Sequence, residues 1–74
     1  MESYENKNGN SGVVAFEILD DEIIVEFKGG GHYLYNYTKP GELHVGEMQK
    51  LARKGVGLAT YVNKHVGKNY AKKL

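Results

Sequence analysis

The sequence predicts a small α+β domain, in which a three-stranded antiparallel meander is followed by two helices packed on one face of the sheet. Three observations predict this class. Apolar residues alternate with charged residues in the first half of the chain, aspartate and glycine turns separate the alternating runs, and apolar residues recur at helical spacing after the single proline. A chain of 74 residues is long enough for one domain with a modest core.

The meander is predicted from three β-like runs. Residues 12–19 and 22–28 are rich in β-branched and aromatic side chains, and an acidic turn joins them into a hairpin. The glycine run 29–31 adopts positive φ without steric cost and forms the second turn. Residues 32–37 then form the third strand.

Two helices are predicted after the meander. Pro40 suits a first helical turn, Thr38 lies close enough to cap it, and apolar spacing extends the helix over residues 41–53. A second helix follows the glycines 55 and 57 and buries Leu58, Val62 and Val66, or Ala59 in place of Leu58, and Gly67 ends it.

The ends of the chain are predicted to be less ordered than its centre. Residues 1–11 are polar and are expected to form a flexible N-terminal arm, residues 12–70 the single domain, and residues 71–74 a frayed tail. The chain has no cysteine, no N-terminal signal pattern and no apolar run near the ~18 residues of a spanning helix. We therefore expect a soluble cytoplasmic protein without a cofactor or a small-molecule substrate.

Three tyrosines at alternate positions are the most informative feature of the sequence. Tyr33, Tyr35 and Tyr37 would share one face of the third strand. Such a stripe is either a wall of the core or a platform on which nucleic-acid bases stack.

Charge is divided unequally along the chain. Residues 1–37 contain seven acidic and two basic side chains, a net charge of −5, whereas residues 38–74 contain eight basic and two acidic, a net charge of +6. This asymmetry is typical of proteins with a polyanionic partner, although the two halves could also neutralise each other within one fold. The basic residues that we expect to contact a nucleic-acid backbone are Lys39, Arg53, Lys54, Lys64 and Lys68.

Alternation in the hairpin predicts a second apolar face. If the helices cover the face with Phe16, Ile18, Ile23, Val25 and Phe27, the opposite face contains Val13, Ala15, Ile24 and Leu34. That face would be covered by the N-terminal arm or would meet another chain, as a homodimer or with a protein partner.

No catalytic or metal-binding constellation is recognisable. His44 and Glu47 are spaced to share a helix face, but no second pair completes a metal site. His65 is expected to pack beside Tyr61 or to face solvent. No base and orienting acid can be assigned to a nucleophile, so we expect neither catalysis nor a bound metal.

The order of motifs resembles a known family. A glycine-rich turn, a Tyr-x-Tyr strand, a proline turn and two helices follow one another, and the residues are Tyr33, Leu34, Tyr35, Pro40, Lys54, Gly55, the segment 61–66 and Tyr70. Over residues 11–70 this order resembles the KTSC domain, a short domain found at the C-terminus of some lysyl-tRNA synthetases and as stand-alone bacterial or phage-borne proteins. The turn 36–40 and the inter-helix segment 56–60 depart from the family pattern. The family has no established activity, and RNA binding has been suggested for it.

Two functions follow as expectations. The first is a non-catalytic module that binds RNA or single-stranded nucleic acid through the tyrosines and the basic residues. The second is a protein–protein interaction module that acts through the apolar sheet face or through the acidic residues of the first turn, Asp20, Asp21 and Glu22.

Overall fold

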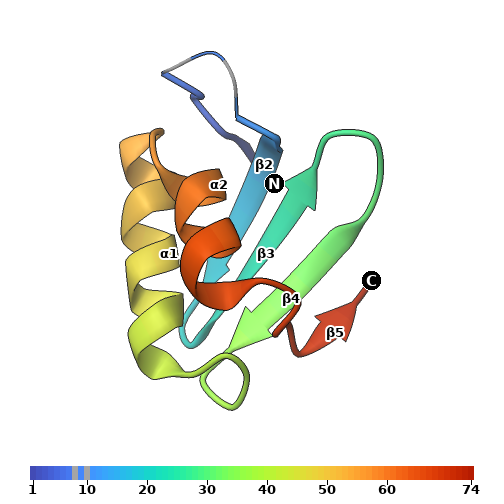
Figure 1. Ribbon diagram of the computed structural model, residues 1–74, viewed down its shortest axis with the longest axis vertical. Coiled ribbons are helices and arrows are strands. Elements are labelled where there is room, and N and C mark those ends of the chain that lie inside the picture. The colour runs from blue at the N-terminus through green and yellow to red at the C-terminus, as the bar shows by residue number, and fades with distance from the viewer. Residues whose placement is uncertain (8, 10) are drawn as a thin grey trace.

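The computed structural model describes residues 1–7, 9 and 11–74 as two helical segments on one face of a five-stranded antiparallel sheet (Figure 1). The strands lie in the order β1-β2-β3-β4-β5. The elements are β1 (Glu2–Ser3), β2 (Val13–Leu19), β3 (Glu22–Phe27), β4 (His32–Asn36), α1 (Glu42–Lys54), α2 (Leu58–Tyr61), the π-helix η1 (Val62–Val66) and β5 (Lys72–Lys73). The α+β class is confirmed, whereas the sheet has five strands instead of the predicted three.

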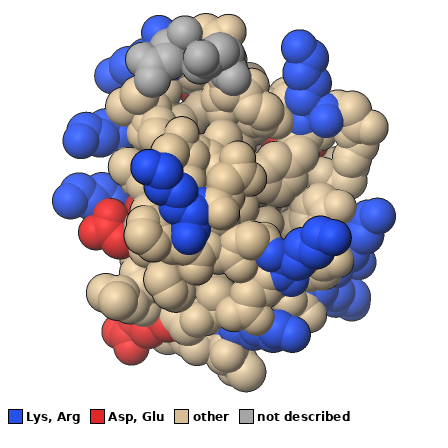
Figure 2. Space-filling view, viewed as in Figure 1, with Lys and Arg blue, Asp and Glu red and all other residues tan. Residues whose placement is uncertain are grey.

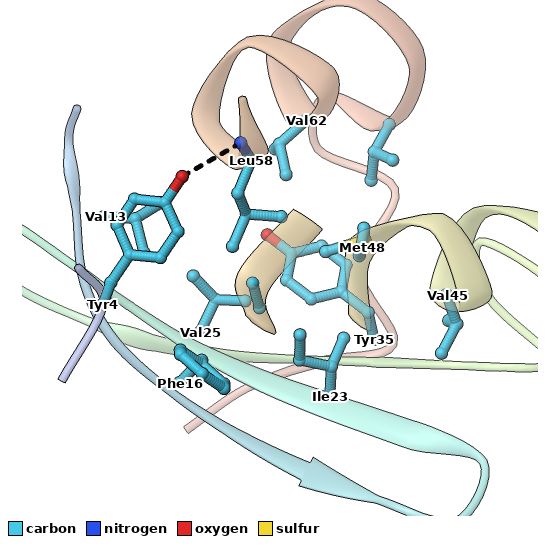
Figure 3. Packing of buried hydrophobic residues seen from close by; sticks show 12 residues of the cluster. Tyr4, Val13, Phe16, Ile23, Val25, Tyr35, Val45, Met48, Leu58 and Val62 are labelled. Atoms are coloured by element: carbon cyan, nitrogen blue, oxygen red, sulfur yellow. Dashed lines mark hydrogen bonds between the residues drawn. The ribbon is translucent and has the colours of Figure 1, made fainter. Parts of the chain in front are cut away.

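The core lies between the central strands and the helices (Figure 3). Cross-strand pairs place Ile23 beside Tyr35 and Phe16 beside Val25 on the helix-facing side of the sheet. Each fully buried aliphatic side chain contributes about 1.5–3 kcal/mol to folding. The side chains that are buried almost completely are Tyr35, Ile23, Met48, Leu58, Val25 and Val45.

Helix α1 packs through Val45, Met48 and Ala52, whose spacing of three and four residues places them on one face. It begins after Gly41 without a side-chain cap, so the prediction that Thr38 caps it is wrong. It ends at Gly55, whose left-handed backbone directs its N–H to the Leu51 and Ala52 carbonyls at 3.0 and 3.2 Å.

The second helical segment begins as α2 and continues directly into η1. Leu58, Val62 and Val66 are buried, as the apolar spacing predicted. The segment ends at Gly67, whose N–H bonds to the Val62 carbonyl five residues earlier. Among the described residues, no helix has the length and apolarity to cross a membrane.

The first residues of the chain pack against the domain. Strand β1 pairs with β2, and Tyr4 is 6% exposed within the core cluster. Its hydroxyl accepts a hydrogen bond of 3.2 Å from the Leu58 N–H, and the Lys7 N–H donates to the Gly55 carbonyl at 2.8 Å. The expectation that this segment buries too little surface to pack is therefore wrong for Glu2–Lys7, because one aromatic ring and these backbone bonds attach it.

A β-bulge changes the predicted faces of β2. The register with β3 shifts between Val13 and Ala15, so Val13 pairs with Phe27 while Phe16 pairs with Val25. Val13 is consequently buried in the core, and its predicted place on the opposite face is wrong. Ala15 pairs with Glu26 and remains on that opposite face.

The last residues of the chain also belong to the sheet. Strand β5 pairs with β4, and the Ala71 and Leu74 N–H groups donate to the Leu34 and His32 carbonyls, each at 2.8 Å. The predicted frayed tail is thus an edge strand, which the backbone of β4 holds in place.

Candidate nucleic-acid interface

The tyrosine stripe lies on the helix-facing side of the sheet. Tyr33 and Tyr35 pair with Val25 and Ile23, which point toward the helices. Tyr35 is 2% exposed, and burial, followed by the charges of Tyr33 and Tyr70, raises the pKa of its hydroxyl to about 12. The expectation that Tyr35 stacks a base is therefore wrong.

The other two tyrosines of the stripe differ in position. Tyr33 is half-buried and keeps part of its ring at the surface. Tyr37 lies beyond the end of β4 in the following turn and is 42% exposed, so it does not continue the stripe. Of the three predicted rings, only Tyr33 is both on the helix-facing side of β4 and accessible.

A groove opens beside Tyr33. It lies between the glycine turn that connects β3 to β4 and the C-terminal end of η1, and its volume is about 690 Å³, within the range of ligand pockets in proteins. Its lining residues are Phe27, Lys28, Gly29, Gly30, Tyr33, Tyr35, Val62, Asn63, Gly67, Lys68 and Tyr70.

Aromatic rings form one wall of this groove. The Tyr33 ring lies 5.6 Å from Phe27 and 4.7 Å from Tyr70 between ring centroids, both in edge-to-face arrangements. A Cβ atom on Gly31 would lie 3.0 Å from the Tyr33 ring, so glycine gives this ring room over the turn. Tyr70 was missed as a site residue, because its place in the groove depends on the turn after Gly67.

Three lysines surround the aromatic wall. Lys28 and Lys68 line the groove from the glycine turn and from the end of η1. Lys73 places its Nζ 5.7 Å from the centroid of the Tyr33 ring, because β5 pairs it directly with Tyr33. Lys28 and Lys73 were missed as site residues, since neither belongs to a helix with a periodic pattern.

The remaining predicted basic residues lie outside the groove. Lys39 is exposed in the turn before α1, Lys64 is exposed on η1, and Lys54 is exposed at the end of α1. Arg53 lies beside the acidic turn between β2 and β3, in a hollow that it shares with Asp20 and Asp21. Of the basic residues predicted from sequence, Lys68 alone lines the groove.

Basic side chains nevertheless dominate the helical face of the molecule. Figure 2 shows Lys and Arg side chains spread over this face, with acidic side chains mainly near α1. On the opposite face, cross-strand pairing places Glu17, Glu22 and Glu26 together. The face opposite the helices is therefore mainly acidic, and Lys72 lies at its edge beside Leu34.

A histidine–tyrosine cluster joins α1 to the second helical segment. The His44 Nδ1 and the Tyr61 hydroxyl are hydrogen-bonded at 2.8 Å, and the His65 ring lies 4.8 Å from Tyr61 between centroids. Partial burial and then the Glu47 carboxylate raise the pKa of the Tyr61 hydroxyl. Both alternatives expected for His65 are found, since its ring contacts Tyr61 and the residue is exposed to solvent. Among residues 1–7, 9 and 11–74, no three His, Cys, Asp or Glu side chains gather to hold a metal ion.

Comparison with known proteins yields no relative of this chain: no family model matches, and neither the curated proteins nor the solved structures contain a match.

Proposed function

We propose that this protein is a small non-catalytic module that binds RNA or single-stranded nucleic acid through the groove beside Tyr33. The observation that supports the proposal best is the combination of an accessible aromatic wall with three lysines around it. The wall consists of Phe27, Tyr33 and Tyr70.

The aromatic rings and the lysines of the groove match the two parts of a nucleotide, its base and its phosphate. An unpaired base is flat and stacks on aromatic side chains with about 1–3 kcal/mol per base. Lysines near the wall offer cations for the flanking phosphates, and their attraction does not depend on base sequence. A duplex keeps its bases stacked on one another, so the groove favours single strands.

The charge distribution favours the same ligand. A polyanion approaches the basic helical face (Figure 2), while Glu17, Glu22 and Glu26 repel it from the opposite face. The resemblance of residues 11–70 to the KTSC domain, for which RNA binding has been suggested, is consistent with this proposal.

The test is a fluorescence-anisotropy titration with a labelled single-stranded RNA octamer of mixed sequence, its DNA equivalent and the RNA duplex. We expect micromolar binding of the single strands and weaker binding of the duplex. Lys68→Glu should weaken binding at least tenfold, because it reverses a charge at the groove. Tyr33→Leu should weaken it about 5- to 100-fold, because it removes one stacking ring.

Lys50→Glu is the matched control, since it makes the same charge reversal on the exposed surface of α1, outside the groove. We expect it to change the affinity less than threefold. Equal losses for the Lys50 and Lys68 variants would show diffuse attraction and contradict a site in the groove. The absence of single-strand binding at micromolar protein would contradict the proposed function as a whole.

A further inference from the structure

The face of the sheet opposite the helices is open. No element formed by residues 1–7, 9 and 11–74 lies over it (Figure 1). Cross-strand pairing joins Ile24 to Leu34 on this face, and Ala15 lies diagonally across from Ile24 on the neighbouring strand. An apolar row therefore crosses β2, β3 and β4 on this face, where Ile24 and Leu34 are half-buried and Ala15 is 8% exposed.

Carboxylates surround the centre of this row. Glu22 and Glu26 flank Ile24 along β3 on the same face, and Glu17 is its direct partner on β2. Within the described part of the chain, the Glu26 carboxylate lies 3.7 Å from the His32 Nε2, and no Lys or Arg makes an ion pair with these carboxylates. One lysine shares the face, because β5 pairs Lys72 with Leu34 at its edge. We call Ala15, Glu17, Glu22, Ile24, Glu26, Leu34 and Lys72 the outer sheet face.

The charges decide which occupant fits. The face has three carboxylates and one lysine, so a symmetric dimer through it would bring two surfaces of net negative charge together, which is unfavourable. Nucleic acid is repelled for the same reason. We propose that the outer sheet face docks a basic segment of another protein, with an aliphatic side chain on Ile24 and Leu34 and cations on the three glutamates.

The geometry of β3 defines the spacing in that segment. Side chains two residues apart on one strand face lie about 6.8 Å apart. Ile24 thus has a carboxylate at about this distance on either side along β3. A Lys-Gly-Leu-Gly-Lys segment in extended form reproduces this order, because side chains two residues apart in an extended segment share one face at the same spacing. Nucleic acid in the groove and a protein on the outer sheet face then occupy opposite sides of one small domain.

The test uses three labelled peptides of twelve residues. One repeats Lys-Gly-Leu-Gly, the second has glycine in place of leucine, and the third has glutamate in place of lysine. We expect the first peptide to bind at least tenfold more tightly than the other two. In ¹H–¹⁵N spectra the shifted amides should be those of β3 and its neighbours, and the groove residues Gly67 and Lys68 should stay unshifted.

Charge reversal at two glutamates, one on the outer sheet face and one elsewhere, distinguishes binding at this face from non-specific electrostatic attraction. Glu17→Lys should weaken binding of the first peptide at least fivefold, whereas Glu42→Lys, on the exposed first turn of α1, should change it less than twofold. Equal effects of the two variants, shifts that map to the helices, or no peptide binding would overturn the proposal. A dimer in sedimentation velocity that Ile24→Lys dissociates would also overturn it, because the occupant would then be a second copy.

Discussion

Tyrosines serve two purposes in this fold because each has an apolar ring and a polar end. Tyr4 buries its ring in the core while its hydroxyl accepts the Leu58 N–H, which would otherwise lack a partner at the start of α2 (Figure 3). Tyr33 and Tyr70 instead remain partly accessible and form the groove wall. Alternation predicted correctly that Tyr33 and Tyr35 share a face. It could not predict their accessibility, because both faces of the strand contain apolar residues.

Because Tyr35 is buried, we expect the free energy of unfolding to fall as the pH becomes alkaline. The phenol is neutral when protonated, and burial raises its pKa from 10.0 to about 12 in the folded protein. Between these values the unfolded chain has lost the proton that the folded chain retains, so stability is complete below pH 10 and declines as the pH rises toward 12. The contribution is on the order of 2 kcal/mol. Urea unfolding between pH 9 and 11.5 should show a shallower decline for Tyr35→Phe than for the wild type.

Tyr37→Phe is the control for this effect, because Tyr37 is exposed and its loss should leave the alkaline decline unchanged. If the stability of the Tyr35→Phe variant declines with pH as steeply as that of the wild type, groups other than Tyr35 cause the alkaline decline.

Helices and strands with a clear hydrophobic periodicity were predicted from the sequence, whereas the two-residue edge strands were not. Alternation and helical spacing gave β3, α1 and the buried side of the second helical segment closely. Strands β1 and β5 are two residues long, and such short segments have no measurable period. The bulge in β2 likewise leaves no sequence signature, yet it moves Val13 from one face to the other. Of the predicted apolar interface, this shift leaves Ala15, Ile24 and Leu34 on the outer sheet face, and Ala15 is itself 8% exposed.

Alanine substitution at two glycines, one within α1 and one directly after its end, should change the stability of the protein in opposite directions. Gly55 ends the helix with φ 79°, and a Cβ atom there would lie 2.6 Å from the Glu5 Cβ. Gly55→Ala should cost more than about 1 kcal/mol, because it combines a strained backbone with an overlap. Gly46 lies within the helix, and a Cβ atom there would meet nothing within 4 Å. Gly46→Ala should stabilise the folded protein by about 1 kcal/mol, since alanine has a higher helix propensity than glycine.

Thermal unfolding measures both changes, because about 1 kcal/mol corresponds to a Tm shift of about 4–8 °C in a domain of this size. A rise in Tm for Gly55→Ala would mean that the junction between α1 and the N-terminal segment relaxes without cost. A fall in Tm for Gly46→Ala would mean that the added methyl group clashes with other atoms at this helix surface.

At the scale of the whole molecule, the fold turns most of the charge asymmetry along the chain into an asymmetry between faces, with Lys72 as a cation on the acidic face beside Leu34. The acidic first half forms the meander, whose outward carboxylates are Glu17, Glu22 and Glu26, and the basic second half forms both helices and β5. The sequence indicated the asymmetry, but only the packing of the helices on a single side of the sheet makes it spatial. The smaller dimensions of the molecule are 22 Å, well above the Debye length of about 8 Å at physiological salt. Charges on one face therefore act almost independently of charges on the other.

This independence predicts how salt affects nucleic-acid binding. Single-strand binding that neutralises Z phosphates falls with salt at a slope of about −0.7Z in a plot of log K against log salt concentration. Lys28, Lys68 and Lys73 around the groove should give a slope near −2. Lys73→Glu should make the slope shallower by about 0.7, because one phosphate contact is lost. Glu17→Lys adds a cation on the outer sheet face and should leave the slope unchanged, with less than a twofold gain in affinity at 150 mM salt. Anisotropy titrations between 50 and 300 mM salt measure both quantities, and a steeper slope for Glu17→Lys would show that nucleic acid also contacts the acidic face.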